Sequence, residues 1–138
     1  SKREYCRSDV LRKAIDRLDG DRSGAEELVD SLVKDRFVDD FRYACAYARE
    51  KSFVSGWGPH KVSTMLLSKQ IDRQTIQDAL SDIDAERASA KLSKVLEVKW
   101  KSLVGDPQAK YKLLRFALSR GYDYSQVRPL VDAMCGAE

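Results

Sequence analysis

Apolar residues recur at helical spacing along almost the whole chain, and polar residues occupy the positions between them. This pattern predicts helices over about 8–18, 23–33, 40–52, 59–69, 72–83, 84–104, 108–120 and 123–135. Ser8, Ser23 and one of Asp39 or Asp40 are the expected caps of the first three. No stretch alternates in the way a half-buried strand does, so the sequence predicts an all-α fold.

The carboxy-terminal half contains an internal repeat. The segment 61–83 aligns with 112–134 at a constant offset of 51 residues, and Asp72 aligns with Asp123 at the start of the second helix of each copy. Each copy reads as a helix, a short turn and an Asp-capped helix. A looser copy lies upstream, in residues 10–32.

Adding the helix that precedes each copy gives tandem three-helix repeats. The predicted units are 1–38, 39–83 and 84–138, with the leading helix of the first clipped to about 2–6. Because tandem helical units bury their faces against their neighbours, we expect an elongated, curved molecule.

Composition limits the classes of protein. The chain has 138 residues, of which 43% are hydrophobic and 34% charged, as expected of a helical domain with a modest core. No apolar run is long enough to span a bilayer. Cys6, Cys45 and Cys135 lie far apart and form no metal-binding pair, so we expect buried free thiols and a reducing cytoplasm.

The sequence offers little for catalysis. His60 is the single histidine, which leaves no histidine relay or histidine-rich metal site. The segment Gly56-Trp57-Gly58 lacks the third glycine of a dinucleotide-binding turn and follows a predicted helix, not a strand. We therefore expect no enzyme activity, no metal and no cofactor.

Charge is uneven along the chain. The net charge is only +3, but residues 91–120 hold eight basic side chains against two acidic ones. On a helix, the basic residues Arg87, Lys91, Lys94 and Lys101 fall within roughly 80° of one another, opposite Leu92 and Leu96. Such a stripe fits a solvated helix face, a track for phosphates, or an acidic groove on a partner protein.

One central segment resembles a known family. It runs from Phe37-Val38-Asp39-Asp40-Phe41-Arg42 through Gly56-Trp57-Gly58-Pro59 to Lys69-Gln70-Ile71. This order is similar to that of the RecX family, bacterial regulators of the RecA recombinase, and the Tyr5-Cys6 start resembles its Bacteroidetes-type members. Gln70 stands where family members usually place a glycine.

The resemblance implies tandem three-helix repeats and a monomer that binds in the groove of a RecA filament on single- or double-stranded DNA, limiting its ATPase and strand exchange. The residues expected to face the filament or its DNA are Arg42, Arg49, Lys61, Arg87, Lys91, Lys94, Lys101, Lys112 and Arg115. Two alternatives stay open. One is a nucleic-acid-binding module that acts without RecA, and the other is a helical-repeat protein adaptor.

Overall fold

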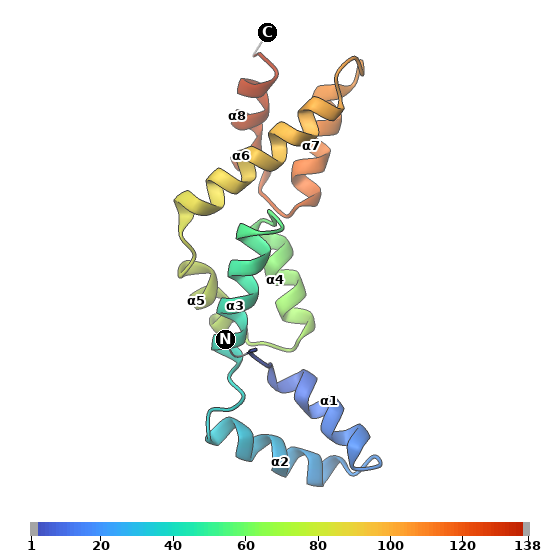
Figure 1. The fold of residues 1–138 in the computed structure, drawn as a ribbon, viewed down its shortest axis with the longest axis vertical. Coiled ribbons are helices and arrows are strands. Elements are labelled where there is room, and N and C mark those ends of the chain that lie inside the picture. The colour runs from blue at the N-terminus through green and yellow to red at the C-terminus, as the bar shows by residue number, and fades with distance from the viewer. Residues whose placement is uncertain (1–2, 137–138) are drawn as a thin grey trace. The chain divides into compact units, whose positions relative to one another are not determined.

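The computed structural model describes residues 3–136, and within them the chain forms helices and no strand (Figure 1). The helices are α1 (Arg7–Arg17), α2 (Arg22–Lys34), α3 (Asp40–Phe53), α4 (Pro59–Ser68), α5 (Arg73–Ser81), α6 (Ala85–Ser102), α7 (Ala109–Ser119) and α8 (Tyr124–Met134). The all-α prediction is confirmed. None of them is long and apolar enough to cross a membrane, as far as these residues go.

The predicted leading helix at 2–6 is wrong where it can be examined. Residues 3–6 are not helical, and residue 2 lies outside the described residues. So short a segment gains too few hydrogen bonds to offset the cost of helix nucleation. Cys6 instead ends this segment in an extended conformation and precedes the first residue of α1.

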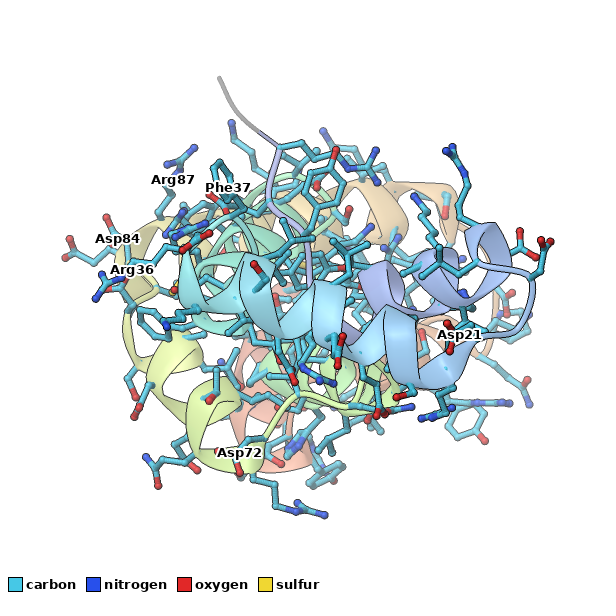
Figure 2. All side chains as sticks on the ribbon, turned by 90° about the horizontal axis from the view of Figure 1, so that it is seen from below. Asp21, Arg36, Phe37, Asp72, Asp84 and Arg87 are labelled. Atoms are coloured by element: carbon cyan, nitrogen blue, oxygen red, sulfur yellow. The ribbon has the colours of Figure 1, made fainter. Side chains whose placement is uncertain are left out.

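Aspartates, more often than the predicted serines, cap the helices. Asp21, not Ser23, caps α2 by accepting a hydrogen bond from the backbone N–H of Gly24. Asp72 caps α5 in the same way, as expected, and Asp84 caps α6. Figure 2 labels three of these residues, Asp21, Asp72 and Asp84, on the surface. Ser8 lies inside α1, and its hydroxyl donates to the carbonyl of Lys69 at 2.6 Å.

The 51-residue offset is visible in the backbone. Helices α4 and α7 end at Ser68 and Ser119, and α5 and α8 begin at Arg73 and Tyr124. Each intervening turn contains a left-handed residue, Gln70 with φ 61° or Gly121 with φ 95°. The aligned apolar side chains are buried in both copies: Val62 with Leu113, Leu66 with Ala117, Ile71 with Tyr122, and Ile76 with Val127.

Packing divides the chain into two compact units. The first comprises Ser1–Ala48 with Met65–Asp82, and the second comprises Arg49–Thr64 with Ile83–Glu138. Both α3 and α4 therefore contribute to each unit. The predicted repeats 1–38, 39–83 and 84–138 describe likeness within the sequence, and that division stays a prediction.

In the first unit, α1 and α2 form a hairpin whose helices lie side by side (Figure 1). Ala14, Ala25 and Val29 fill the space between them. Their small side chains let the two helices approach closely. The thiols of Cys6 and Cys45 are also buried, as predicted, whereas Cys135 in the second unit is only half-buried and corrects that expectation.

The core of the second unit lies among α6, α7 and α8. Leu92 and Leu96 of α6, Leu113 of α7 and Val127 of α8 are at most 2% exposed. Burying each such side chain stabilises the fold by roughly 1.5–3 kcal/mol relative to leaving it in water. Tyr122 closes this core at the α7–α8 turn.

Two glycines allow the turn before α4 to dock on the α7–α8 turn. The backbone N–H groups of Gly58 and His60 donate to the carbonyls of Arg120 and Gly121, at 2.6 and 3.0 Å. They are N–H groups at the start of a helix, which have no partner within the helix itself. A Cβ on Gly58 would overlap the Gly121 carbonyl, and one on Gly121 would overlap the backbone of Lys61.

Candidate partner-binding surface

Helix α6 presents the predicted basic stripe on the second unit. Arg87, Lys94 and Lys101 are exposed and Lys91 is half-exposed, while Leu92 and Leu96 on the opposite side are buried. The guanidinium of Arg87 lies 4.2 Å from the ring centroid of Phe53. Among residues 3–136, no carboxylate pairs with Lys91, Lys94 or Lys101. The stripe thus carries charge that its own unit does not neutralise.

The predicted cations of α7 differ from those of α6, since they have partners within the chain. Lys112 forms an ion pair with Asp106 at 2.5 Å and thereby holds the pKa of that carboxyl below its usual value. Arg115 lies 5.8 Å from the ring centroid of Tyr111. Both side chains are exposed, but Lys112 already has a neutralising partner.

Arg42 occupies a structural position in the first unit. Its guanidinium contacts Glu4 at 3.0 Å and Asp39 at 3.7 Å, and it donates to the carbonyl of Arg36. These contacts join the start of α3 to the segment before α1. Arg49, seven residues further along the same helix, is exposed and belongs to the second unit.

Lys61 lies against the turn that precedes α4. Its ammonium is 4.5 Å from the ring centroid of Trp57, and that of Lys51 is 4.8 Å from the same ring. Both contacts have the geometry of cation–π pairs. Trp57 is half-buried with two lysines over it, so the ring offers little free surface for stacking.

His60 and Asp123 form a pair on the surface of the second unit. The imidazole Nε2 lies 2.5 Å from a carboxylate oxygen of Asp123, and both side chains are 63% exposed. Asp123 stands at the predicted cap of α8, but its side chain makes no capping hydrogen bond. The histidine therefore replaces the helix terminus as partner of this carboxylate.

A groove that the sequence did not reveal runs between α6 and α7. It has a volume of about 520 Å³ and is lined by Lys91, Lys94, Val98, Lys99, Phe116 and Arg120, among others. The charged groups of Lys99 and Arg120 lie 5.3 and 4.9 Å from the ring centroid of Phe116. Helical periodicity places Lys99 beside Val95, but only the packing of α7 brings Arg120 to the same groove.

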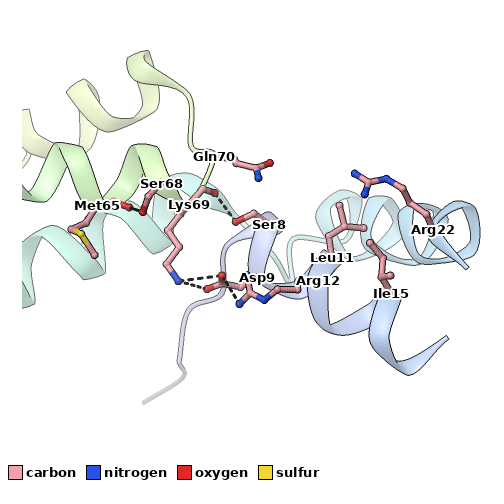
Figure 3. A pocket seen from close by; sticks show the side chains of 10 residues that line it. All are labelled: Ser8, Asp9, Leu11, Arg12, Ile15, Arg22, Met65, Ser68, Lys69 and Gln70. Carbon is pink, nitrogen blue, oxygen red and sulfur yellow. Dashed lines mark hydrogen bonds and ion pairs between the residues drawn. The ribbon is translucent and has the colours of Figure 1, made fainter. Parts of the chain in front are cut away.

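The first unit contains a second cavity, of about 490 Å³, between the start of α1 and the end of α4 (Figure 3). On its wall, the ammonium of Lys69 contacts both carboxylate oxygens of Asp9, at 2.9 and 3.1 Å, and Arg12 contacts one of them. Burial alone would raise the pKa of Asp9, but the hydrogen bonds from Lys69, Cys6 and Arg12 outweigh it and lower that pKa. The same contact raises the pKa of Lys69.

We interpret these charges as a structural contact that holds α1 against the α4–α5 turn. Every acidic oxygen on the wall is already shared by cations, and Ser8 adds a hydrogen bond to the same turn. No group of three or more potential metal ligands occurs among the described residues.

Helices α3 and α4, with all but the last residue of α5, match a family model. That model is described as the second three-helix domain of RecX, and it matches residues 39–80. Two solved structures share the fold. A crystal structure of regulatory protein RecX superposes with a TM-score of 0.81 at 22% identity, covering 99% of this chain and 65% of that one. RecX from Lactobacillus salivarius gives 0.79 at 22%, covering 95% and 86%.

Curated relatives agree with these matches. The regulatory protein RecX of Clostridium tetani (strain Massachusetts / E88) is 27% identical over 83% of this chain and 54% of its own length. That of Clostridium perfringens (strain 13 / Type A) is 29% identical over 80% of this chain and 53% of its own. The chain thus spans about half the length of these relatives.

By its fold, then, the molecule is a helical-repeat protein of the three-helix-domain class, whose relatives are named as regulators and not as enzymes. Within that class, residues 39–80 match the second three-helix domain of RecX, and most of the chain is similar to regulatory proteins named RecX.

Proposed function

We propose that this chain is a non-enzymatic regulator that binds RecA and its nucleoprotein filament and limits RecA ATPase and strand exchange. The single observation that carries the proposal is the run of uncompensated cations along α6, in a chain that is similar to RecX proteins. A filament of protein on DNA offers phosphates and acidic side chains, either of which attracts such a stripe.

Some of the predicted contact residues are better placed than others to bind a partner, because they have no carboxylate partner within the described part of the chain. Lys91, Lys94 and Lys101 need no rearrangement to meet a partner, whereas Lys112 would first exchange Asp106 for the partner's group. Arg42 would exchange two carboxylates. We therefore assign the main role to the α6 lysines, with Arg87 beside them.

ATP hydrolysis by RecA on single-stranded DNA tests the proposal directly. The chain, added at a ratio of one to one in low salt, should lower the rate. Reversing Lys91, Lys94 and Lys101 to Glu should abolish this effect. The matched control reverses Lys13, Lys34 and Arg73, three exposed cations of the first unit, and changes the net charge by the same amount.

Three outcomes would contradict the proposal. An unchanged hydrolysis rate with the unaltered chain removes RecA as the target. Equal loss of effect in both triple variants shows that net charge acts, not the stripe. Tight binding of labelled DNA in the absence of RecA, with a steep dependence on salt, would favour the stand-alone nucleic-acid-binding alternative.

A further inference from the structure

The groove between α6 and α7 concentrates positive charge. Its wall carries the charged groups of Lys91, Lys94, Lys99 and Arg120, and no carboxylate lines it. Elsewhere on the same unit, neighbouring lysines are neutralised, as Lys110 is by Asp132 at 2.8 Å. Four cations around one concavity repel each other, and an anionic group placed there relieves that repulsion.

The same groove is apolar at its centre. Val98 is 71% exposed and lies on the α6 face between Lys91 and Lys94, on the side away from the buried Leu96. It therefore contributes nothing to the core of its own unit. On the α7 side, the half-buried ring of Phe116 lies beneath Lys99 and Arg120. Apolar surface ringed by cations is typical of a contact with another protein.

We propose that this groove binds an acidic peptide segment of a partner protein, with one aliphatic or aromatic side chain seated against Val98 and Phe116. Carboxylates on either side of that side chain would pair with Lys91, Lys94 and Lys99. The identification of the partner protein as RecA rests on the proposed function, whereas the chemistry of the segment does not.

The lining favours a peptide over a nucleic-acid backbone. Phosphates would satisfy the lysines but would leave Val98 uncovered. The ring of Phe116 is already engaged by Lys99 and Arg120, and Arg120 is further held by a hydrogen bond to the Ser55 carbonyl at 3.0 Å. A base therefore finds no free aromatic face in this groove, while an apolar side chain finds both Val98 and the ring edge.

Fluorescence anisotropy with the full chain measures this binding. The probe is a labelled peptide of about nine residues that carries Asp and Glu around one central Phe. The two comparison probes are the same peptide with Ser in place of Phe, and labelled oligothymidylate. We expect saturable binding of the Phe peptide and about tenfold weaker binding of the Ser peptide, which corresponds to roughly 1.4 kcal/mol.

Two substitutions in the groove and one outside it locate the site. Lys94→Glu and Val98→Asp should each weaken binding of the Phe peptide at least about tenfold. Arg73→Glu changes the charge equally, at an exposed position of the first unit, and should change the affinity less than about twofold. All three positions are exposed, and circular dichroism checks that each variant keeps its helices.

The outcomes separate this proposal from the proposed function. Equal weakening by Arg73→Glu, equal affinity for the Ser peptide, or tighter binding of oligothymidylate would each overturn the peptide groove. Peptide binding with the expected pattern, but no effect on RecA ATPase, would support the groove and contradict RecA as its partner. Absence of peptide binding, with inhibition of RecA intact, would overturn the peptide groove and leave the proposed function in place.

Discussion

Gln70 adopts a backbone conformation that glycine adopts more easily. Its φ of 61° lies in the left-handed region, immediately after α4, where its N–H and that of Ile71 bond back to the carbonyls of Leu67 and Leu66. This is the usual ending of a helix, in which glycine is preferred because a Cβ is strained there. The aligned position of the second copy is Gly121, which carries the same conformation without strain.

Replacing Gln70 by Gly should therefore stabilise the first unit by roughly 0.5–1 kcal/mol, since relief of strain outweighs the extra freedom of the unfolded chain. Urea denaturation monitored by circular dichroism measures the change. Arg36→Gly offers a comparison at another left-handed position with φ 64°. A loss of stability in Gln70→Gly would mean that the glutamine side chain makes a contact worth more than the strain.

Asp9 predicts a pH dependence for the first unit. Its pKa in the folded chain is lowered, so its stabilising contribution is present above the ordinary carboxyl range near pH 4 and is lost as pH falls through the lowered value. Asp9→Asn should cost roughly 1–2 kcal/mol at pH 7, and this difference from the unaltered chain should vanish in acid. Thermal unfolding between pH 7 and pH 2 measures it.

Asp30→Asn is the control for that experiment. Asp30 also pairs with an arginine, Arg7, but its side chain is 67% exposed, and such surface pairs contribute little. Its substitution should change stability by less than about 0.5 kcal/mol at either pH. Similar effects for Asp9 and Asp30 would show that the contact with Lys69 is no stronger than an ordinary surface pair.

At the scale of the elements, the docking of one turn on another depends on Gly121. Its φ is 95°, and a Cβ would meet the backbone of Lys61, whose position cannot shift without moving α4. Gly105 is the matched case, because it has a similar φ of 87° with open space around it. An alanine at either position would be strained by the left-handed conformation, but only an alanine at position 121 would also overlap Lys61.

Gly121→Ala should thus destabilise the second unit by at least about 1 kcal/mol more than Gly105→Ala does. Hydrogen exchange of the amides of Gly58 and His60 reports the effect locally, since both donate to this turn. We expect faster exchange at these amides in Gly121→Ala and unchanged exchange in Gly105→Ala. Equal behaviour of the two variants would show that the turns separate at little cost.

The helices show how much of the fold can be predicted from the sequence. Periodicity placed every helix within a few residues, and the 51-residue offset aligned the helix ends at Ser68 and Ser119, because both depend on local spacing. Ser23 was a wrong cap because α2 begins at Arg22, which puts Ser23 inside the helix and Asp21 at the cap, where it accepts from the N–H of Gly24. The first residue of a helix is decided by backbone geometry that the spacing of residues does not encode.

The candidate surface was less accessible to prediction, for a physical reason. Charge counting finds Lys94 and Lys112 equally, but only tertiary packing gives Lys112 a partner in Asp106 and leaves Lys94 without one. Helical spacing already places Val98 away from the apolar stripe of α6, but not beside Phe116 and Arg120 of α7 in one groove. Which cations are neutralised, and which exposed residues line a groove, follow from contacts between helices.

The net charge of the whole chain is only +3, but its basic residues are unevenly distributed. The salt dependence of the binding affinity shows which anions these residues contact. Neutralising a lysine that contacts a DNA phosphate reduces the slope of log affinity against log salt by about one, because one fewer counterion is released. A lysine that pairs with a carboxylate in a protein groove changes affinity without that loss of slope.

We therefore expect Lys94→Gln, which lines the peptide groove, to weaken binding to a RecA–DNA filament and keep the slope. Lys101→Gln, on the part of the stripe outside the groove, should reduce the slope by about one if the chain also touches DNA. Sedimentation of filaments with labelled chain, at four or more salt concentrations, measures both. A reduced slope for Lys94→Gln would assign the groove to phosphate, and two unchanged slopes would confine the contact to protein.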